Sequence, residues 1–166
     1  YSTEYGFINY FISTLLQSDI RIDWLGSLDI APYSCVIVDV WQMTPFVALV
    51  LYAGLLSIPV EIYEAAQIDG ASGIYLFRYV TLPLMTPYIT VVLILRLIEL
   101  LKFFDPVFVL TMGGPAGATE TIAFYIYFVS LKFFNQGYGS ALAVMLTLFI
   151  SFLSLAFLKI MQKVGG

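Results

Sequence analysis

The stretch "EAAQIDGASGIYLFRYVTLP", residues 64–83, decides the fold, because it places a polar, acidic helix between two strongly apolar segments. Ser57 and Pro59 are typical of a helix start, and good helix formers follow them. Gly70 fits a helix stop, where a left-handed backbone costs glycine little. Ser72 can cap a second short helix through about Tyr79. The segment 58–86 is therefore expected to hold two short helices joined by a sharp turn.

The flanking segments have the composition of membrane helices. The chain is 61% hydrophobic with a mean hydropathy of +0.95, and residues 40–60 and 133–158 contain no charged side chain. A spanning helix needs about 20 apolar residues, and a small soluble domain could not bury this much apolar surface. We expect an all-α membrane protein with spans near 33–57, 87–112 and 138–161. In the last span, Gly139 and Ala143 form a small-xxx-small pair suited to close helix packing.

Composition excludes several functions. The net charge of −4 argues against a nucleic-acid partner. One cysteine and no histidine leave no disulfide and no common transition-metal site, and no GxxxxGK loop for ATP is present. We therefore expect no metal and no catalytic residue in this chain. A membrane-embedded enzyme using Asp39 or Glu99 lacks a recognisable catalytic partner, whereas an ATP-independent channel or carrier stays an alternative that predicts no ATPase partner.

The loops suggest an orientation in the membrane. "GGPAGAT" at 113–119 is expected to be a loop, and Thr119 to cap a following helix that is too short to cross. Three spans place 58–86 and the C-terminus on one side and 113–137 on the other. The cations of the first side are Arg78, Lys159 and Lys163, against Arg21 and Lys132 on the second. This bias favours a cytoplasmic 58–86 and an external 113–137.

Charged residues inside the expected spans support two interpretations. Asp39 lies in the first span, and Arg96, Glu99, Lys102 and Asp105 follow one another at steps of three in the second. Such residues usually face a partner or a cavity, because each costs about 2.5–3.5 kcal/mol at mid-membrane depth. They either neutralise one another along the helix or provide a polar path for a substrate.

Residues 64–83 resemble the EAA loop of ABC importer permeases. The matching residues are Glu64, Ala65, Ala66, Asp69, Gly70, Ala71, Leu82 and Pro83. The surrounding motifs "VDVWQMTPF", "GLLSIP", "FDPVFVLTMGGP" and "TETIAFYIY" are similar to the first-subunit permeases of maltose-type carbohydrate importers. The resemblance covers essentially the whole chain. It implies a partial permease domain over 1–166, the C-terminal half of a type I importer transmembrane domain, with three further helices expected before Tyr1.

The resemblance also implies roles for residues and partners. The loop 58–86 would be the coupling helix that docks on a cytoplasmic ATPase. Positions that match sugar contacts are Asp39, Gln42, Met43, Phe46, Arg96, Glu99 and Leu100, and an external scoop corresponds to Gly113, Gly114 and Pro115. The chain would sit in lipid, in a prokaryotic plasma membrane. It would hold no cofactor and would work with a second permease, an ATPase dimer carrying ATP and magnesium, and an external solute-binding protein. The expected cargo is a sugar or oligosaccharide, with glycerol phosphate or another polyol as the alternative.

Overall fold

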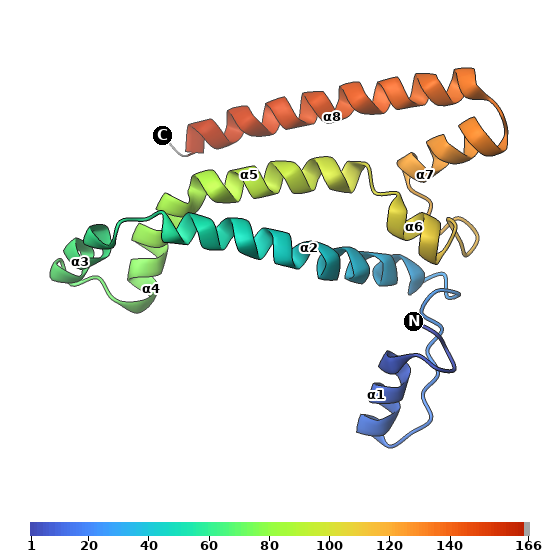
Figure 1. The fold of residues 1–166 in the computed structure, drawn as a ribbon, viewed down its shortest axis with the longest axis horizontal. Helices are drawn as coiled ribbons and strands as arrows, with labels where there is room; N and C mark the ends of the chain where they lie inside the picture. Colours follow the sequence, from blue (N-terminus) through green and yellow to red (C-terminus); the bar gives the residue numbers. More distant parts are fainter. Residues whose placement is uncertain (165–166) are drawn as a thin grey trace. The chain divides into compact units, whose positions relative to one another are not determined.

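The computed structural model describes the backbone of residues 1–164 and the side chains of residues 1–160, and every regular element in this part of the chain is helical. Figure 1 shows the order of these elements along the chain. They are α1 (Phe7–Leu16), α2 (Ala31–Leu56), α3 (Val60–Ile68), α4 (Gly73–Leu76), a π-helical turn η1 (Phe77–Thr81), α5 (Leu82–Leu101), α6 (Asp105–Leu110), α7 (Ile122–Tyr127), a second π-helical turn η2 (Phe128–Lys132) and α8 (Gln136–Val164).

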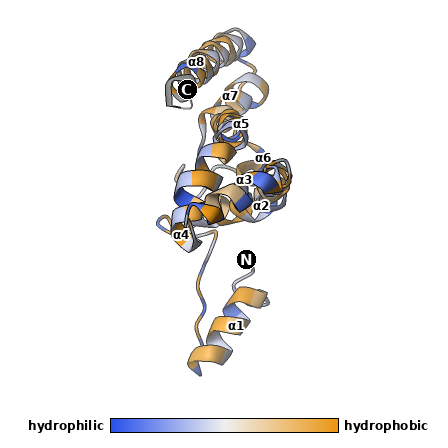
Figure 2. Cartoon of the chain, turned by 90° about the vertical axis from the view of Figure 1, so that its left-hand side faces the viewer, coloured by the Kyte–Doolittle hydropathy of each residue, from blue (hydrophilic) through white to orange (hydrophobic). Residues whose placement is uncertain are grey.

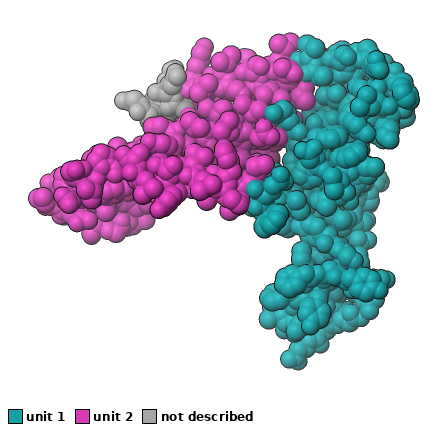
Figure 3. Space-filling model, viewed as in Figure 1, with its two compact units in different colours: residues 1–42, 102–144 teal, residues 43–101, 145–166 magenta. Residues whose placement is uncertain are grey.

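The chain divides into two compact units (Figure 3). The first combines Tyr1–Gln42 with Lys102–Val144, and the second combines Met43–Leu101 with the chain from Met145 onward. The loop of interest, 58–86, lies entirely within the second unit.

Within the described residues, three helical stretches are long and apolar enough to cross a bilayer. They are Ala31–Leu56, Gly73–Leu101 and Gln136–Ile160, of 26, 29 and 25 residues. Figure 2 shows apolar residues along their ribbons. Large apolar side chains stay uncovered on them, including Leu148 and Phe152, which are 66% and 69% exposed. Such a surface suits lipid or a membrane partner rather than water. The all-helical fold class with three long apolar helices is thus as expected from the sequence.

The bounds of the middle helix differ from the expected 87–112. Helical structure begins at Gly73 and runs through Pro87 without a break, so Pro87 lies inside α5 and does not start it. The helix then ends at Leu101, because Pro106 has no N–H to continue the ladder and instead occupies the first turn of α6. The residues from Asp105 to Leu110 therefore form a separate short helix rather than the end of a span.

In the first unit, the segment before α2 is tied together by one amide side chain. Asn9 is buried and donates from Nδ2 to the carbonyls of Thr3 (3.1 Å) and Ile22 (2.9 Å). Its Oδ1 accepts from the indole Nε1 of Trp24 at 2.7 Å. Ser34 on α2 donates to the Trp24 carbonyl at 2.8 Å. These bonds fix α1 and the irregular segment 18–24 against the start of α2.

The same unit contains an aromatic cluster around α6 and α7. Phe104 stacks on Phe108 with ring centroids 5.3 Å apart, and Tyr127 meets both rings at 5.2 and 5.3 Å. Phe124 extends the cluster and is buried. Pairs of this kind stabilise by roughly 0.5–1.5 kcal/mol beyond the burial of their area. The cluster holds the loop 111–121 in a fixed shape.

The expected cap at Thr119 is wrong. Thr121 is the N-cap of α7, and its Oγ1 accepts from the amide of Phe124 at 3.2 Å. Thr119 is buried and donates to the carbonyl of Gly114 at 2.7 Å, while its Oγ1 lies 2.6 Å from Oγ1 of Thr111. Thr119 thus closes the preceding loop, because its hydroxyl reaches a carbonyl across that loop rather than an amide of the helix.

Candidate functional site

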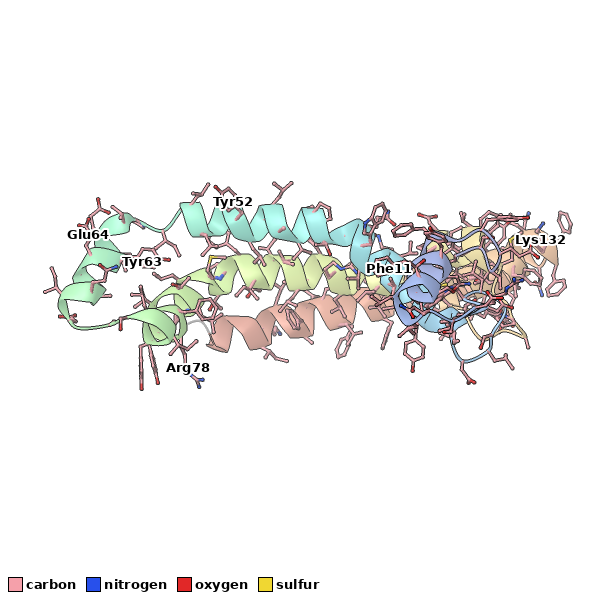
Figure 4. The ribbon with its side chains drawn as sticks, turned by 90° about the horizontal axis from the view of Figure 1, so that it is seen from below. Phe11, Tyr52, Tyr63, Glu64, Arg78 and Lys132 are labelled. Carbon is pink, nitrogen blue, oxygen red and sulfur yellow. The ribbon has the colours of Figure 1, made fainter. Side chains whose placement is uncertain are left out.

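The loop 58–86 presents its first helix as an open surface. None of the nine residues of α3 is buried, and Glu64, Ala65 and Asp69 are exposed. Figure 4 shows Glu64 on α3 and Arg78 on the following helical arm pointing outward. A helix that buries none of its residues within its own unit, while exposing an alanine and a carboxylate, has the properties of a docking element.

The turn that ends α3 is a complete Schellman motif. The amide of Ala71 donates to the carbonyl of Ala66 at 2.9 Å, and the amide of Gly70 donates to the carbonyl of Gln67 at 3.0 Å. Gly70 has φ +86°, in the left-handed region. The predicted glycine stop is confirmed. A Cβ at position 70 would meet no atom within 4 Å, so the requirement for glycine is one of backbone conformation and not of space.

The second arm of the loop is not an isolated short helix. α4 continues through η1 into α5, and the amide of Leu82 donates to the carbonyl of Phe77, five residues earlier. This wide turn immediately precedes Pro83, whose ring would clash with a carbonyl of a regular helical ladder. Ser72 precedes α4 without a side-chain cap bond. The expectation of two short helices is therefore corrected to one short helix and a continuous arm.

Buried and exposed residues occur together where η1 joins α5. Thr81 and Met85 are buried, whereas Leu82 and Pro83 are exposed. A pocket of about 450 Å³ opens beside η1, and it is lined by Ile74, Phe77, Arg78 and Leu82. The pocket offers apolar surface with one cation beside it, in the same unit as α3.

The residues predicted to line a substrate path fall on two helices. On α2, positions 39, 42, 43 and 46 follow the i, i+3, i+4, i+7 spacing of one helix face. On α5, positions 96, 99 and 100 follow the i, i+3, i+4 spacing. Asp39 is 8% exposed, Arg96 is half-buried and Glu99 is exposed. Each of these three charged residues has an interaction partner within the chain.

The residues predicted to form an external scoop lie in the loop held by the aromatic cluster. Gly113 has φ +83°, and a Cβ there would lie 2.7 Å from Cε1 of Phe124. Glycine is therefore required at this position both by backbone conformation and by the neighbouring ring. Gly114 and Pro115 follow it and are half-buried.

Two features of the structure were not expected from the sequence. Ser57 does not start α3; its hydroxyl bonds the end of α2 and meets Tyr88 at 2.6 Å. Asn9 organises the first 30 residues. The only sequence signals were a glycine inside an apolar helix, at Gly54, and a polar residue inside "GFINYFI".

The ionisable groups of Arg21 and Tyr1, which lie outside the spans, have raised pKa values. Arg21 and Asp19 form an exposed ion pair, with Nη2 and Oδ2 3.2 Å apart. Nε of Arg21 also donates to Oδ1 of Asp19 at 3.2 Å, and this hydrogen bond raises the pKa of Arg21. Burial raises the pKa of Tyr1. In the part of the chain that the structure describes, no group of three or more His, Cys, Asp or Glu residues could hold a metal ion.

Comparison with known proteins places the chain among transport proteins. The profile of the family described as "Binding-protein-dependent transport system inner membrane component" matches residues 7–164. The chain is 43% identical over 166 residues to the trehalose/maltose transport system permease protein MalF of Thermococcus litoralis, covering 99% of this chain and 54% of that protein. It is 38% identical over 159 residues to the sulfoquinovosyl glycerol transport system permease protein SmoG of Agrobacterium fabrum, covering 96% and 51%. The chain thus spans about half the length of these relatives.

Solved structures show the same fold. A crystal structure of a bacterial ABC transporter involved in the import of the acidic polysaccharide alginate matches with a TM-score of 0.86 at 23% identity, covering 98% of this chain and 57% of that chain. A crystal structure of a bacterial alginate ABC transporter in complex with alginate pentasaccharide-bound periplasmic protein matches with a TM-score of 0.74 at 26% identity, covering 96% and 54%.

Proposed function

This chain belongs to the family of binding-protein-dependent transport system inner membrane components, and we propose that it is a permease subunit of an ATP-driven importer for sugars or oligosaccharides. Its long apolar helices make it a multi-pass membrane protein. Relatives named for trehalose/maltose and for sulfoquinovosyl glycerol support a carbohydrate cargo. The observation on which the proposal mainly rests is the exposed, sharply terminated helix α3 between two of the long apolar helices.

The proposed machine contains further subunits. A second permease completes the path, a cytoplasmic ATPase dimer binds ATP and magnesium, and an external solute-binding protein delivers the cargo. The alginate transporter that shares this fold was solved with a periplasmic protein, which supports the last partner. In this arrangement the chain sits in a prokaryotic plasma membrane, with 58–86 in the cytoplasm and 113–137 outside. The chain itself is a non-catalytic subunit, because ATP is hydrolysed on the partner.

The loop 58–86 would couple ATP hydrolysis to transport. Ala65 and Ala66 allow a partner surface to approach closely, and Glu64 offers a carboxylate to a cation on the ATPase. The Schellman stop at Gly70 gives this docking helix a fixed end. The turn that follows leads into an arm that is continuous with α5. When the ATPase displaces α3, most of that displacement would therefore be transmitted to the membrane helix α5.

The substrate path would use the polar faces of α2 and α5. Sugar hydroxyls donate to carboxylates and accept from a guanidinium group, so Asp39, Glu99 and Arg96 have the right chemistry. The ring of Phe46 can cover the apolar C–H face of a sugar. In the competing interpretation, these charges only neutralise one another and fix the packing of the helices. The variants Glu99→Gln and Glu99→Leu distinguish these two interpretations.

The test is uptake by the complete complex. The full-length protein is reconstituted into proteoliposomes with its second permease and ATPase, and the external binding protein is added with labelled maltose or trehalose. We expect uptake that requires ATP and the binding protein and that stops when a non-hydrolysable ATP analogue replaces ATP. Glycerol 3-phosphate, tested in parallel, identifies a polyol phosphate importer. Uptake of either cargo without ATP would contradict the proposal and favour a carrier or channel.

A further inference from the structure

We propose that Gly54, Ser57 and Tyr88 form a positioning contact, here called the loop clasp, that joins the two ends of the loop 58–86. This inference rests on the proposed coupling function of that loop. All three residues belong to the second unit. Gly54 and Ser57 lie at the end of α2, where the chain enters the loop, and Tyr88 lies on α5, where the chain has left it.

The hydrogen bonds of the clasp have a defined direction. Ser57 Oγ donates its single proton to the carbonyl of Gly54 at 2.7 Å. Ser57 Oγ and Tyr88 OH lie 2.6 Å apart. Because a serine hydroxyl has only one proton, Tyr88 must be the donor in this second bond. The phenol proton of Tyr88 thus connects α5 to the last turn of α2.

The tyrosine ring reaches Ser57 only because position 54 has no side chain. A Cβ on Gly54 would lie 2.6 Å from Cγ of Tyr88, 2.8 Å from Cδ2 and 3.0 Å from Cβ. These atoms are at the base of the tyrosine side chain, which cannot move aside without moving α5. Gly54 is buried under the ring, although it lies inside a membrane helix where glycine is not required by backbone conformation.

The position of the clasp suggests its role. Only Ser57, Ile58 and Pro59 separate α2 from α3, and this connection contains no regular helix. The other arm is helical from Gly73 into α5. Without a bond between the two ends, α3 could tilt about the 57–59 connection while the α4–α5 arm stayed in place. With the bond, a displacement of α3 moves the ends of α2 and α5 together.

The expected effect is moderate. A hydrogen bond of this kind shifts an equilibrium by about two- to tenfold in net terms. Loss of the phenol proton or of the serine hydroxyl should therefore raise the population with separated loop ends by about that factor. The number of substrate molecules transported per ATP hydrolysed should fall by at most that factor, because ATPase movements reach only one of the two helices in the separated population.

The experiment uses the full-length protein in its complete complex in proteoliposomes. Tyr88→Phe keeps the ring over Gly54 and removes only the hydroxyl, Ser57→Ala removes its partner, and Ser57→Thr restores a hydroxyl. Tyr52→Phe is the matched control, because Tyr52 is 60% exposed on α2 and points away from α5 (Figure 4). Glu64→Lys reports independently on the coupling function of the loop. Substrate transported per ATP, complex yield and thermal stability are measured for each.

We expect a measurably lower transport per ATP, by at most about tenfold, in Tyr88→Phe and Ser57→Ala. Ser57→Thr and Tyr52→Phe should have near-normal values, and the complex yield should be unchanged. The double variant Ser57→Ala/Tyr88→Phe should be no more impaired than Ser57→Ala alone, because Ser57→Ala already removes the bond to Tyr88. If the losses of transport per ATP in the two single variants add fully in the double variant, the clasp is refuted. It is also refuted if the variants have a lower thermal stability but normal transport per ATP. If only Glu64→Lys uncouples, the clasp is refuted and the proposed function stands. If Glu64→Lys also stays coupled, the coupling function of the loop is refuted as well.

Discussion

Replacing Gly139 by alanine should separate α8 from the turn that precedes it. Gly139 is buried, and an added Cβ would lie 1.8 Å from Oγ and 2.9 Å from Cβ of Ser130 on η2. The contact also reaches the backbone, since Cα of Ser130 would be 3.2 Å away. Overpacking of this kind costs about 1–3 kcal/mol. Glycine-to-alanine replacement in a helix gains about 1 kcal/mol, so the net loss is about 0–2 kcal/mol.

Gly137 provides the control for this variant. It lies two residues earlier in the same helix, is exposed, and a Cβ there would meet nothing within 4 Å. Gly137→Ala should therefore be neutral or stabilising, whereas Gly139→Ala lowers the denaturation midpoint of the detergent-solubilised protein. Ser130→Gly should restore much of the loss in the Gly139→Ala background, because it removes Oγ and Cβ together. Equal midpoints for the two alanine variants, or no rescue by Ser130→Gly, would refute the close packing.

Three further predictions address the loop, the N-terminal segment and the substrate path. Gly70→Pro should abolish substrate-stimulated ATPase activity of the complex, because proline cannot adopt φ +86° or supply the amide proton that Gly70 donates. Gly70→Asn should retain most of this activity. Equal ATPase activities of the two variants would contradict the Schellman stop. Asn9→Leu leaves the Trp24 indole and two carbonyls without their partner, at about 1–3 kcal/mol for each buried group. These groups should then turn to water, so the emission of Trp24 in a Trp41→Phe background should shift to the red. An unchanged spectrum would argue against the Asn9 contacts. Glu99→Gln should weaken apparent transport affinity about ten- to hundredfold at nearly normal basal ATPase activity, as expected for loss of a charged hydrogen bond. If Glu99→Gln has unchanged affinity and Glu99→Leu fails to assemble, Glu99 serves to neutralise charge rather than to contact substrate.

Composition and local backbone rules were enough to predict the main features of the fold. Long uncharged stretches predict membrane helices, because few other structures can accommodate them. The stop at Gly70 was predictable because a left-handed residue after a run of helix formers has few alternatives to glycine. Both features depend on residues that are close in the sequence.

Features that depend on distant residues could not be predicted. The hydroxyl pair of Ser57 and Tyr88 joins residues 31 positions apart, and Ser57 has the same local pattern as a helix cap. Thr119 was the expected cap, but Thr121 caps α7, because the hydroxyl of Thr119 closes the preceding loop through contacts that local sequence rules do not show. The end of α5 at Leu101 is set by Pro106, five residues later, at a place where the apolar pattern continues. The residues proposed for the substrate path fall on common helix faces, but the proposed role would also depend on the proposed second permease, which is a different chain.

The most direct test of the central claim is photocrosslinking from α3. Ala66 is replaced by benzoylphenylalanine in the full-length protein, expressed with the complete transporter, and the membranes are irradiated. Ala118, in the loop 113–137, receives the same group as a control for the opposite side of the membrane. We expect an adduct between position 66 and the ATPase subunit, and none between position 118 and that subunit. An adduct of position 66 with the external binding protein, or an ATPase adduct at position 118 alone, would contradict the coupling role of α3.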